Sequence, residues 1–260
     1  MHLTLDAHRL EYRIVLPARP SSPEHTMLVL LHEGLGSVAT WKDFPDVLAT
    51  STGYPVLAYS RYGYGNSSKL EESRTPCYMH HEALTVLPEV LTKLGIHKPP
   101  FLIGHSDGAS IAIIYAGGGQ AVKGMVLMAP HVFVEDLTTD AIATSVSRFK
   151  QGGLAAKLAR YHRHPHSMFN GWRDIWLKTE FRAWNIESSV QGCTAPMLLI
   201  QGGNDPYGTL AQIESIERRT KGPVEKLIFS DCGHAPHAER PDETVASISA
   251  FVRKWVDSDV

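Results

Sequence analysis

The chain has 260 residues, of which 43% are hydrophobic and 20% charged, and its formal net charge is −2 with a pI near 6.7. This length and composition predict a globular protein with one main core and room for an insertion. Because no large basic surface follows from this charge, nucleic acids and anionic membranes are excluded as expected partners.

Short apolar segments with β-branched residues recur along the chain and predict the strands of a mostly parallel sheet. The first segment, Leu3 to Leu16, is expected to supply an antiparallel hairpin at one edge of that sheet. Continuous apolar runs, typical of strands buried on both faces, follow at residues 27–32, 55–60, 101–106, 124–130, 196–202 and 225–231.

Two further segments have the period of a helix. Residues 82–96 predict an amphipathic helix that is interrupted by Pro88 and ends at Gly95, and residues 242–256 predict a C-terminal helix that Pro241 opens. Strands that alternate with helices predict an α/β fold with helices on both faces of the sheet.

Residues 132–192 break this alternation, because they contain helical patterns and no good strand. We predict that they form a helical cap insertion over the C-terminal edge of the strands, where ligands bind in open α/β sheets. The core domain would then comprise residues 1–131 and 193–260. Most aromatic residues of the insertion are expected to pack it onto the core, and one or two to line the pocket; they are Trp172, Trp176, Trp184, Phe149, Phe169 and Phe181.

The cysteines Cys77, Cys193 and Cys232 are too few and too far apart for a disulfide framework or a paired metal site, so we expect free thiols in a reducing compartment. No signal-peptide pattern opens the sequence, and no apolar run approaches the ~20 residues of a membrane span. We therefore predict a cytoplasmic protein.

The strongest motif is Gly104-His105-Ser106-Asp107-Gly108, which fits G-x-S-x-G between an apolar strand and a helical run. On such a turn the serine adopts a strained backbone conformation that exposes its hydroxyl, and the two glycines avoid collisions with neighbouring backbone. The helix N-terminus behind it favours negative charge. We predict Ser106 to be a nucleophile; the alternative is a serine in an ordinary glycine-bounded turn.

A serine hydroxyl needs an adjacent base to become a nucleophile. His234 follows Gly233 at the end of the last predicted strand, so we expect it to point back toward Ser106. His237, three residues later, is the weaker candidate.

A second histidine cluster, His162, His164 and His166, suggests a metal site. No carboxylate or cysteine pattern accompanies it and Pro165 breaks its regular spacing, so we interpret it as a solvated loop and predict no metal.

The histidine needs a carboxylate that holds its tautomer and stabilises its protonated form. Asp205 follows the predicted strand at residues 196–202 and gives the chain order Ser106, Asp205, His234, which is the order expected where a nucleophilic serine lies on such a strand-to-helix turn. An Asp-Pro turn former is the alternative reading of Asp205. The rival acids are Glu135 and Asp136.

The oxyanion that develops during acyl transfer needs fixed hydrogen-bond donors. We predict the backbone N–H of Asp107, next to the nucleophile, and the N–H of Gly34 in the glycine-rich turn LHEGLGS. Glu33 and Leu35 are neighbouring alternatives to Gly34.

Taken together, the motifs LHEGLGS, SRYGYGNS, GHSDG, QGGNDPYG and CGHAPH resemble, in order, those of the α/β-hydrolase superfamily, specifically its single-domain members with a helical cap. The resemblance runs nearly end to end and implies an eight-stranded, mainly parallel sheet and cofactor-free chemistry. Two positions depart from the family pattern. Glu33 stands where glycine is common, and Asp107 stands where an apolar residue or glutamine is usual; pairing with the helix dipole is our interpretation of Asp107.

These observations predict a serine hydrolase that cleaves a carboxylic ester or related acyl bond of a small molecule through an acyl-enzyme intermediate. Lactones, thioesters and carbon–carbon bonds are alternative substrates, because the fold does not choose among them. A dehalogenase is disfavoured, since dehalogenases of this fold need an aspartate nucleophile and residue 106 is serine. A small-molecule receptor with vestigial hydrolysis is the alternative from another class, and the sequence predicts no oligomeric state.

Overall fold

The computed structural model describes residues 1–19 and 26–256. Its strands are β1 (His2–Leu5), β2 (His8–Val15), β3 (Leu28–Leu31), β4 (Val56–Tyr59), β5 (Phe101–His105), β6 (Gly124–Met128), β7 (Met197–Gly202) and β8 (Val224–Phe229). They form one eight-stranded sheet in the order β1-β2-β4-β3-β5-β6-β7-β8. β1 and β2 pair antiparallel at one edge, β2 also pairs antiparallel with β4, and all other pairs are parallel. The predicted α/β class, the edge hairpin and the eight-stranded sheet are confirmed.

The central strands are continuous apolar runs because both of their faces are covered. In β3, Leu28 and Leu30 pack into one core, whereas Val29 and Leu31 pack into the core on the opposite face. Successive side chains of a strand point to opposite faces, so a strand buried on both sides has no polar alternation.

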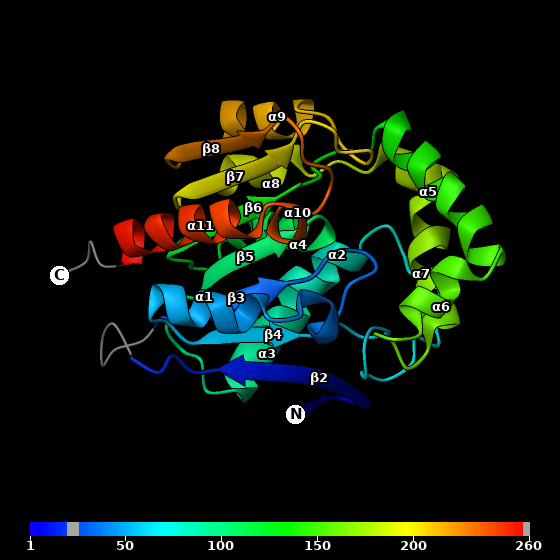
Figure 1. Cartoon of the computed structure of the whole chain (residues 1–260), viewed down its shortest axis with the longest axis horizontal. Coiled ribbons are helices and arrows are strands. Elements are labelled where there is room, and N and C mark those ends of the chain that lie inside the picture. Colours follow the sequence, from blue (N-terminus) through cyan, green and yellow to red (C-terminus); the bar gives the residue numbers. More distant parts are fainter. Residues whose placement is uncertain (20–25, 257–260) are drawn as a thin grey trace.

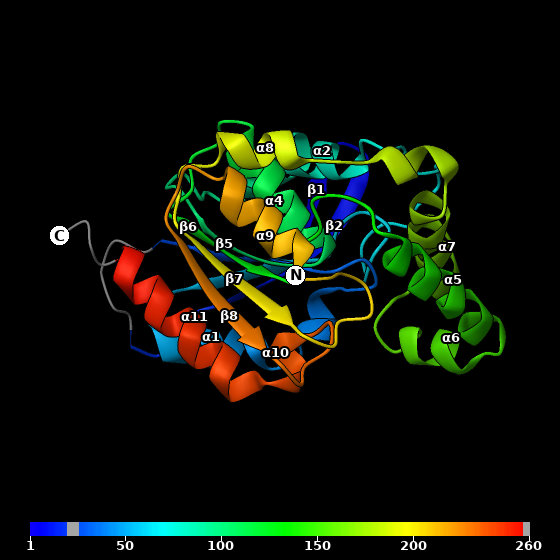
Figure 2. The same cartoon turned by 90° about the horizontal axis from the view of Figure 1, so that it is seen from above.

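Helices lie on both faces of the sheet (Figures 1 and 2). One face carries α1 (Phe44–Thr52), α10 (Pro236–Glu239) and α11 (Pro241–Val256). The other carries α2 (Tyr78–His81), α3 (Leu87–Lys93), α4 (Asp107–Gly117), α8 (Glu187–Gly192) and α9 (Ala211–Arg219). The predicted C-terminal helix is confirmed as α11.

The helix predicted at residues 82–96 begins earlier, at Tyr78, and α2 runs into α3 through a π-helical turn, η2 (Glu82–Val86). Proline at residue 88 has no N–H to donate to the preceding turn. The helix therefore widens before Pro88 instead of breaking, and α3 ends at Lys93, shortly before the predicted end at Gly95, whose φ is 70°.

Between β6 and β7 the chain forms α5 (Asp136–Lys150), α6 (Gly153–Leu158), α7 (Pro165–Trp176) and the short helix η3 (Thr179–Ala183). We call α5, α6 and α7 the α5–α7 layer. Figure 1 shows this layer beside the sheet, beyond the arrowheads of the strands, whereas α8 packs against α4. A cap domain with the boundaries 132–192 stays a prediction.

None of the described helices combines the length and the hydrophobicity needed to cross a membrane.

Candidate active site

Ser106 lies in the turn between β5 and α4, with φ 53° and ψ −117°. This left-handed region is costly for a residue with a side chain, and it persists only where the surroundings enforce it. The two glycines of the motif show how. A Cβ on Gly104 would lie 2.4 Å from the carbonyl oxygen of Gly108, and a Cβ on Gly108 would lie 1.9 Å from that of Leu31. The elbow therefore has room only for glycine at both positions.

His234 and Asp205 lie side by side after β8 and β7, at the same sheet edge as Ser106. The His234 Nδ1 is 2.9 Å from Asp205 Oδ1 and 2.8 Å from Asp205 Oδ2. Both residues are positioned by their loops, and Ser106 and His234 line the same cavity. The three predicted side chains thus converge from three distant parts of the sequence.

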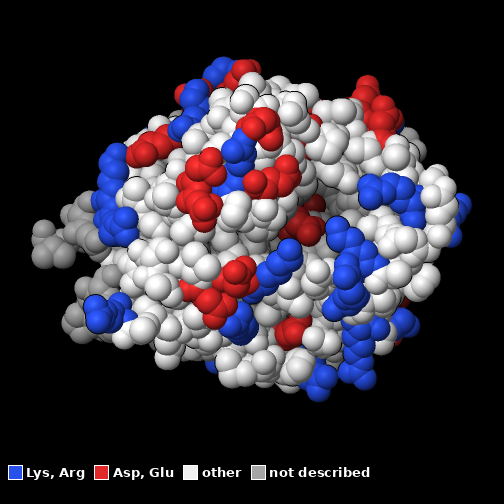
Figure 3. Space-filling model, in the orientation of Figure 1, with Lys and Arg blue, Asp and Glu red and all other residues white. Residues whose placement is uncertain are grey.

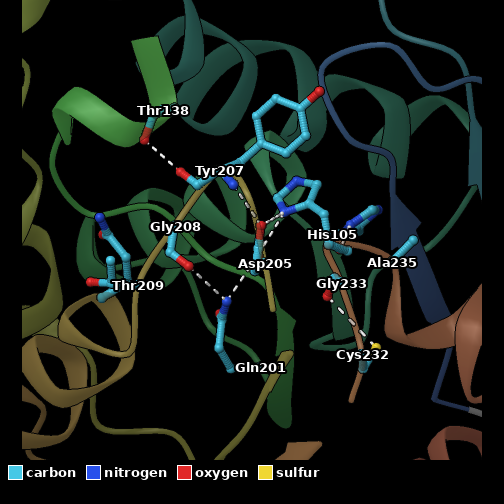
Figure 4. Close-up of polar contacts among 12 residues, drawn as sticks. His105, Thr138, Gln201, Asp205, Tyr207, Gly208, Thr209, Cys232, Gly233 and Ala235 are labelled. Carbon is cyan, nitrogen blue, oxygen red and sulfur yellow. Dashed lines mark hydrogen bonds and ion pairs between the residues drawn. The ribbon is translucent and has the colours of Figure 1, made fainter. Parts of the chain in front are cut away.

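Asp205 is buried and fully engaged. Its Oδ1 accepts a hydrogen bond from the Tyr207 N–H, and its Oδ2 accepts one from the Gln201 side chain, both at 2.8 Å. Figure 4 shows Asp205 between these two partners. Burial alone would raise the pKa of Asp205, but the hydrogen bonds and the neighbouring His234 outweigh burial and lower it. The carboxyl group is therefore ionised, as a partner for an imidazolium must be.

The rival acids point elsewhere. The Glu135 carboxylate accepts hydrogen bonds from the N–H and hydroxyl of Thr209 and from the Gln212 side chain, so it fastens α9 to the start of α5. Asp136 forms an exposed ion pair with Arg182. Among the described residues, Asp205 is the carboxylate that bonds to His234.

Two residues that the sequence analysis missed hold the loop around His234. The Glu239 carboxylate accepts hydrogen bonds from the N–H groups of Gly233 and Ala235, on either side of His234. The His105 Nε2 donates to the carbonyl oxygen of His234 at 2.7 Å. Glu239 lies five positions after His234 in the sequence, and this nearness is the signal from which its contact with the loop could have been predicted.

The predicted oxyanion residues, Gly34 and Asp107, both line the cavity beside Ser106. Gly34 lies directly under the α5–α7 layer, because a Cβ there would lie 2.1 Å from the indole Nε1 of Trp172. The turn itself is closed by a hydrogen bond from the Gly36 N–H to the carbonyl oxygen of Glu33. This close packing fixes the backbone at Gly34, as the predicted role of its N–H requires.

The Asp107 side chain lies in the first turn of α4, where the helix-dipole interpretation places it, and it also has two buried partners. It accepts a hydrogen bond from the Tyr78 hydroxyl at 2.7 Å and lies 3.6 Å from the guanidinium of Arg61. The Arg61 and Asp107 side chains are only 2% and 1% exposed. Since a buried charge is stable only with partners, Asp107 ties the nucleophile elbow to the end of β4.

Arg61 also holds the loop of residues 32–36, which carries the predicted oxyanion donor Gly34 and which we call the oxyanion loop. Its guanidinium donates to the carbonyl oxygens of His32 and Glu33, and its backbone N–H donates to the His32 Nε2. The His32 Nδ1 in turn donates to the carbonyl oxygen of Glu33. Burial, followed by the Arg61 charge, lowers the pKa of His32 well below its ordinary value, so the ring stays neutral.

Glu33 turns its carboxylate into the loop and toward the cavity. One oxygen accepts a hydrogen bond from the Leu35 N–H, and the residue lines the cavity near Ser106. Burial raises the pKa of this carboxyl group. The departure from glycine therefore places an acidic residue at the wall of the cavity beside Ser106.

The cavity at Ser106 has a volume of about 200 Å³ and an aromatic wall. The tryptophans that line it are Trp172 and Trp176, both on α7, and Tyr207, in the loop of Asp205 after β7, lines it as well. The other aromatic residues of the insertion pack against one another; the rings of Phe149 and Phe169 stack at 3.9 Å. The prediction that one or two of these aromatics line the pocket fits this arrangement.

The predicted histidine cluster does not lie in one solvated loop, although His166 is exposed. His162 was expected in a solvated loop, but it is buried at 4% exposure. Its Nδ1 accepts a hydrogen bond from the Gly65 N–H, and its Nε2 donates to the Leu35 carbonyl oxygen, so it links the α5–α7 layer to the oxyanion loop. No cluster of metal-binding side chains occurs in the described ranges 1–19 and 26–256.

His237, the weaker candidate base, packs against the rings of Trp41 and Phe44. Burial, and then the nearby His234 charge, lowers its pKa to about 4. Between this value and the ordinary value near 6.5, the unfolded chain binds a proton that the folded protein excludes. His237 therefore destabilises the fold as the pH falls through this window.

This destabilisation can be measured by comparing how the free energy of unfolding depends on pH in the wild type and in His237→Gln. From pH 6.5 to pH 4 the wild type should lose unfolding free energy faster than His237→Gln, by up to about 1.4 kcal/mol per pH unit. Urea unfolding at several pH values measures both slopes. Parallel slopes would show that His237 titrates alike in the folded and unfolded states.

Residues 28–247 of the chain match the model of the alpha/beta hydrolase family. The chain belongs to the alpha/beta hydrolase family. The match covers the loops of Ser106, Asp205 and His234, and membership of this family supports a hydrolytic enzyme.

Similar proteins act on different bonds. A proline iminopeptidase of Lactobacillus delbrueckii subsp. lactis is 32% identical over 117 residues, which cover 44% of this hydrolase chain and 38% of the relative. The match therefore spans less than half of the relative's length. The crystal structure of a proline iminopeptidase from Mycobacterium smegmatis superimposes with a TM-score of 0.76 at 19% identity, covering 100% of this chain and 99% of the other. An esterase from Rhodococcus sp. ECU1013 gives 0.74 at 19% identity, with 98% of each chain covered. These structural likenesses show the fold alone.

Proposed function

We propose that this hydrolase cleaves carboxylic esters or closely related acyl bonds with a Ser106–His234–Asp205 triad. The observation that carries the proposal is the convergence of a strained serine and an Asp-bonded histidine on one cavity. A serine on an elbow beside such a histidine is the constellation of acyl-transfer enzymes on several unrelated folds.

The first half of the reaction forms an acyl-enzyme. Because Asp205 engages the His234 Nδ1, the Nε2 is the ring nitrogen left to accept the Ser106 proton. The Ser106 Oγ then attacks the substrate carbonyl carbon, and the oxyanion is held by the N–H groups of Gly34 and Asp107. The His234 imidazolium returns the proton to the leaving oxygen as the ester bond breaks.

The second half releases the acid. A water molecule gives a proton to His234 and its oxygen attacks the acyl carbon, after which the bond to Ser106 breaks and Ser106 regains the proton. The α5–α7 layer acts in this proposal as a cap, since Trp172 and Trp176 cover the cavity and limit solvent access. His131 also lines the cavity. Burial lowers its pKa to about 4, so the ring is neutral at neutral pH.

The scissile bond is best tested with a panel. The purified protein should turn over p-nitrophenyl acetate and butyrate continuously, and lactone, thioester, proline-amide and carbon–carbon substrates run beside them will rank the bond types. A fluorophosphonate probe should label the protein, and peptide mass spectrometry should find the label on Ser106.

Two results would contradict the proposal. Labelling at a residue other than Ser106 would remove the nucleophile. A single stoichiometric burst without steady turnover on the whole panel would instead support a receptor with vestigial hydrolysis.

A further inference from the structure

A second cavity, of about 300 Å³, adjoins the cavity at Ser106. The two share Glu33, Leu35, His105 and Ala235, which belong to the oxyanion loop, the elbow and the histidine loop. We call the cavity at Ser106 the inner bay and the second cavity the outer bay. A substrate that reacts at Ser106 can therefore extend past Glu33 and Leu35 into the outer bay.

The two bays differ in chemistry. The inner bay has a wall of Ile142, Trp172, Trp176 and Tyr207 and contains no Lys or Arg. The outer bay is lined by two lysines from opposite sides, Lys42 after η1 (Val38–Trp41) on the core and Lys157 on α6. In the described part of the chain neither lysine forms an ion pair, so both charges are available to a ligand.

Lys42 has a second distinguishing feature. Its φ of 52° and ψ of −121° nearly equal those of Ser106, although no glycine stands there. A strained backbone at a cavity wall is a common property of functional sites. Its charge also reaches into the outer bay, because it adds to burial and to His234 in lowering the pKa of His237, another residue of that wall.

The α5–α7 layer strengthens this charge. Between Asp140 and Asp174 the sequence contains no acidic residue and six basic ones, in a chain whose net charge is −2. They are Arg148, Lys150, Lys157, Arg160, Arg163 and Arg173. Figure 3 shows a hollow in the face that it views, with Lys and Arg side chains along the side formed by this layer. The basic side chains on this side of the hollow favour ligands of the opposite sign.

Glu33 limits where a negative ligand group can lie. It is the acidic residue shared by both bays, at their junction. An anion next to the scissile carbonyl would meet this carboxyl group, whereas an anion at the outer end would meet Lys42 and Lys157. The charges therefore favour an anionic group that is separated from the reacting bond.

We propose that the substrate has two parts, an apolar part that fills the inner bay and an anionic group, a carboxylate or a phosphate, that binds Lys42 and Lys157 in the outer bay. This inference rests on the proposed acyl hydrolysis at Ser106. The anionic group takes no part in the bond exchange and supplies binding energy at a distance from it.

Matched ester pairs that differ only in one charge test the inference. In the first pair, para-(butyryloxy)benzoate and its methyl ester carry the difference in the leaving group. In the second, mono-p-nitrophenyl glutarate and its methyl ester carry it in the acyl part. A third probe, para-(butyryloxy)phenyl phosphate, distinguishes a phosphate site from a carboxylate site.

The quantity measured is the ratio of kcat/KM for the charged ester to that for its neutral partner. In at least one pair this ratio should fall about tenfold in the double variant Lys42→Gln/Lys157→Gln, mainly through KM. It should also fall in about 0.5 M NaCl, because salt screens exposed charges. Lys178→Gln, a lysine outside both bays, is the matched control and should leave the ratio unchanged.

A binding measurement separates this inference from the hydrolysis itself. In Ser106→Ala, quenching of tryptophan fluorescence should report binding of the charged esters, since Trp172 and Trp176 line the inner bay. Adding the two lysine substitutions should weaken their Kd about tenfold. Equal Kd values with and without the lysines would overturn the anion site even if esters are hydrolysed, and loss of hydrolysis with retained lysine-dependent binding would overturn only the proposed reaction.

Discussion

Ser106→Ala and His234→Ala should each lower kcat for p-nitrophenyl butyrate by about 10⁴- to 10⁶-fold, and the double variant should lose little more than either one alone. The reason is that the hydroxyl and the imidazole act as one unit: a serine without its base, or a base without its serine, has no proton transfer to perform. Stopped-flow and steady-state kinetics measure the three losses. Losses that multiply in the double variant would show that the two side chains act in separate steps.

The identity of the acid is tested in the same assay. Asp205→Asn should cost about 10³- to 10⁴-fold in kcat, because an amide can favour the wrong tautomer of His234. Glu135→Gln is the matched control, since Glu135 bonds Thr209 and Gln212 instead of the histidine. A larger loss in Glu135→Gln than in Asp205→Asn would reassign the acid.

The sequence was informative wherever a local rule fixes the backbone. Apolar runs predicted the buried parallel strands, since a strand covered on both faces must be apolar throughout. The elbow at Ser106 was predictable for a similar reason. Gly104 and Gly108 each lie where a Cβ would collide with backbone, so the turn itself requires the two glycines of the motif. In both cases the residues that carry the signal are close together in the chain.

The supports of the site were harder to predict because they depend on contacts between distant segments. Arg61 is 46 positions from Asp107, and Tyr78 reaches Asp107 from α2. His162 was misinterpreted for the same reason, since its two partners, Leu35 and Gly65, come from loops of the core. No pattern around any of these residues indicates its partner before the fold is known.

Arg61 is the residue at which these distant contacts meet. It reaches the oxyanion loop through the carbonyl oxygens of His32 and Glu33, and it reaches the elbow through Asp107. The two predicted oxyanion donors, Gly34 and Asp107, therefore depend on one buried cation for their relative position. An arginine suits this place because its planar guanidinium donates in several directions at once and keeps its charge when buried.

Arg61→Met should consequently lower the free energy of unfolding by about 3–5 kcal/mol, because Asp107 would remain buried without its cation. The control Arg13→Met removes a half-exposed ion pair with Asp46 and should cost about 1 kcal/mol or less. Urea unfolding at neutral pH measures both. In the fraction of Arg61→Met that folds, kcat should fall more than KM rises, since misaligned oxyanion donors weaken the transition state more than the bound substrate. Equal stability losses in the two variants would mean that the buried pair is not what joins the elbow to the oxyanion loop.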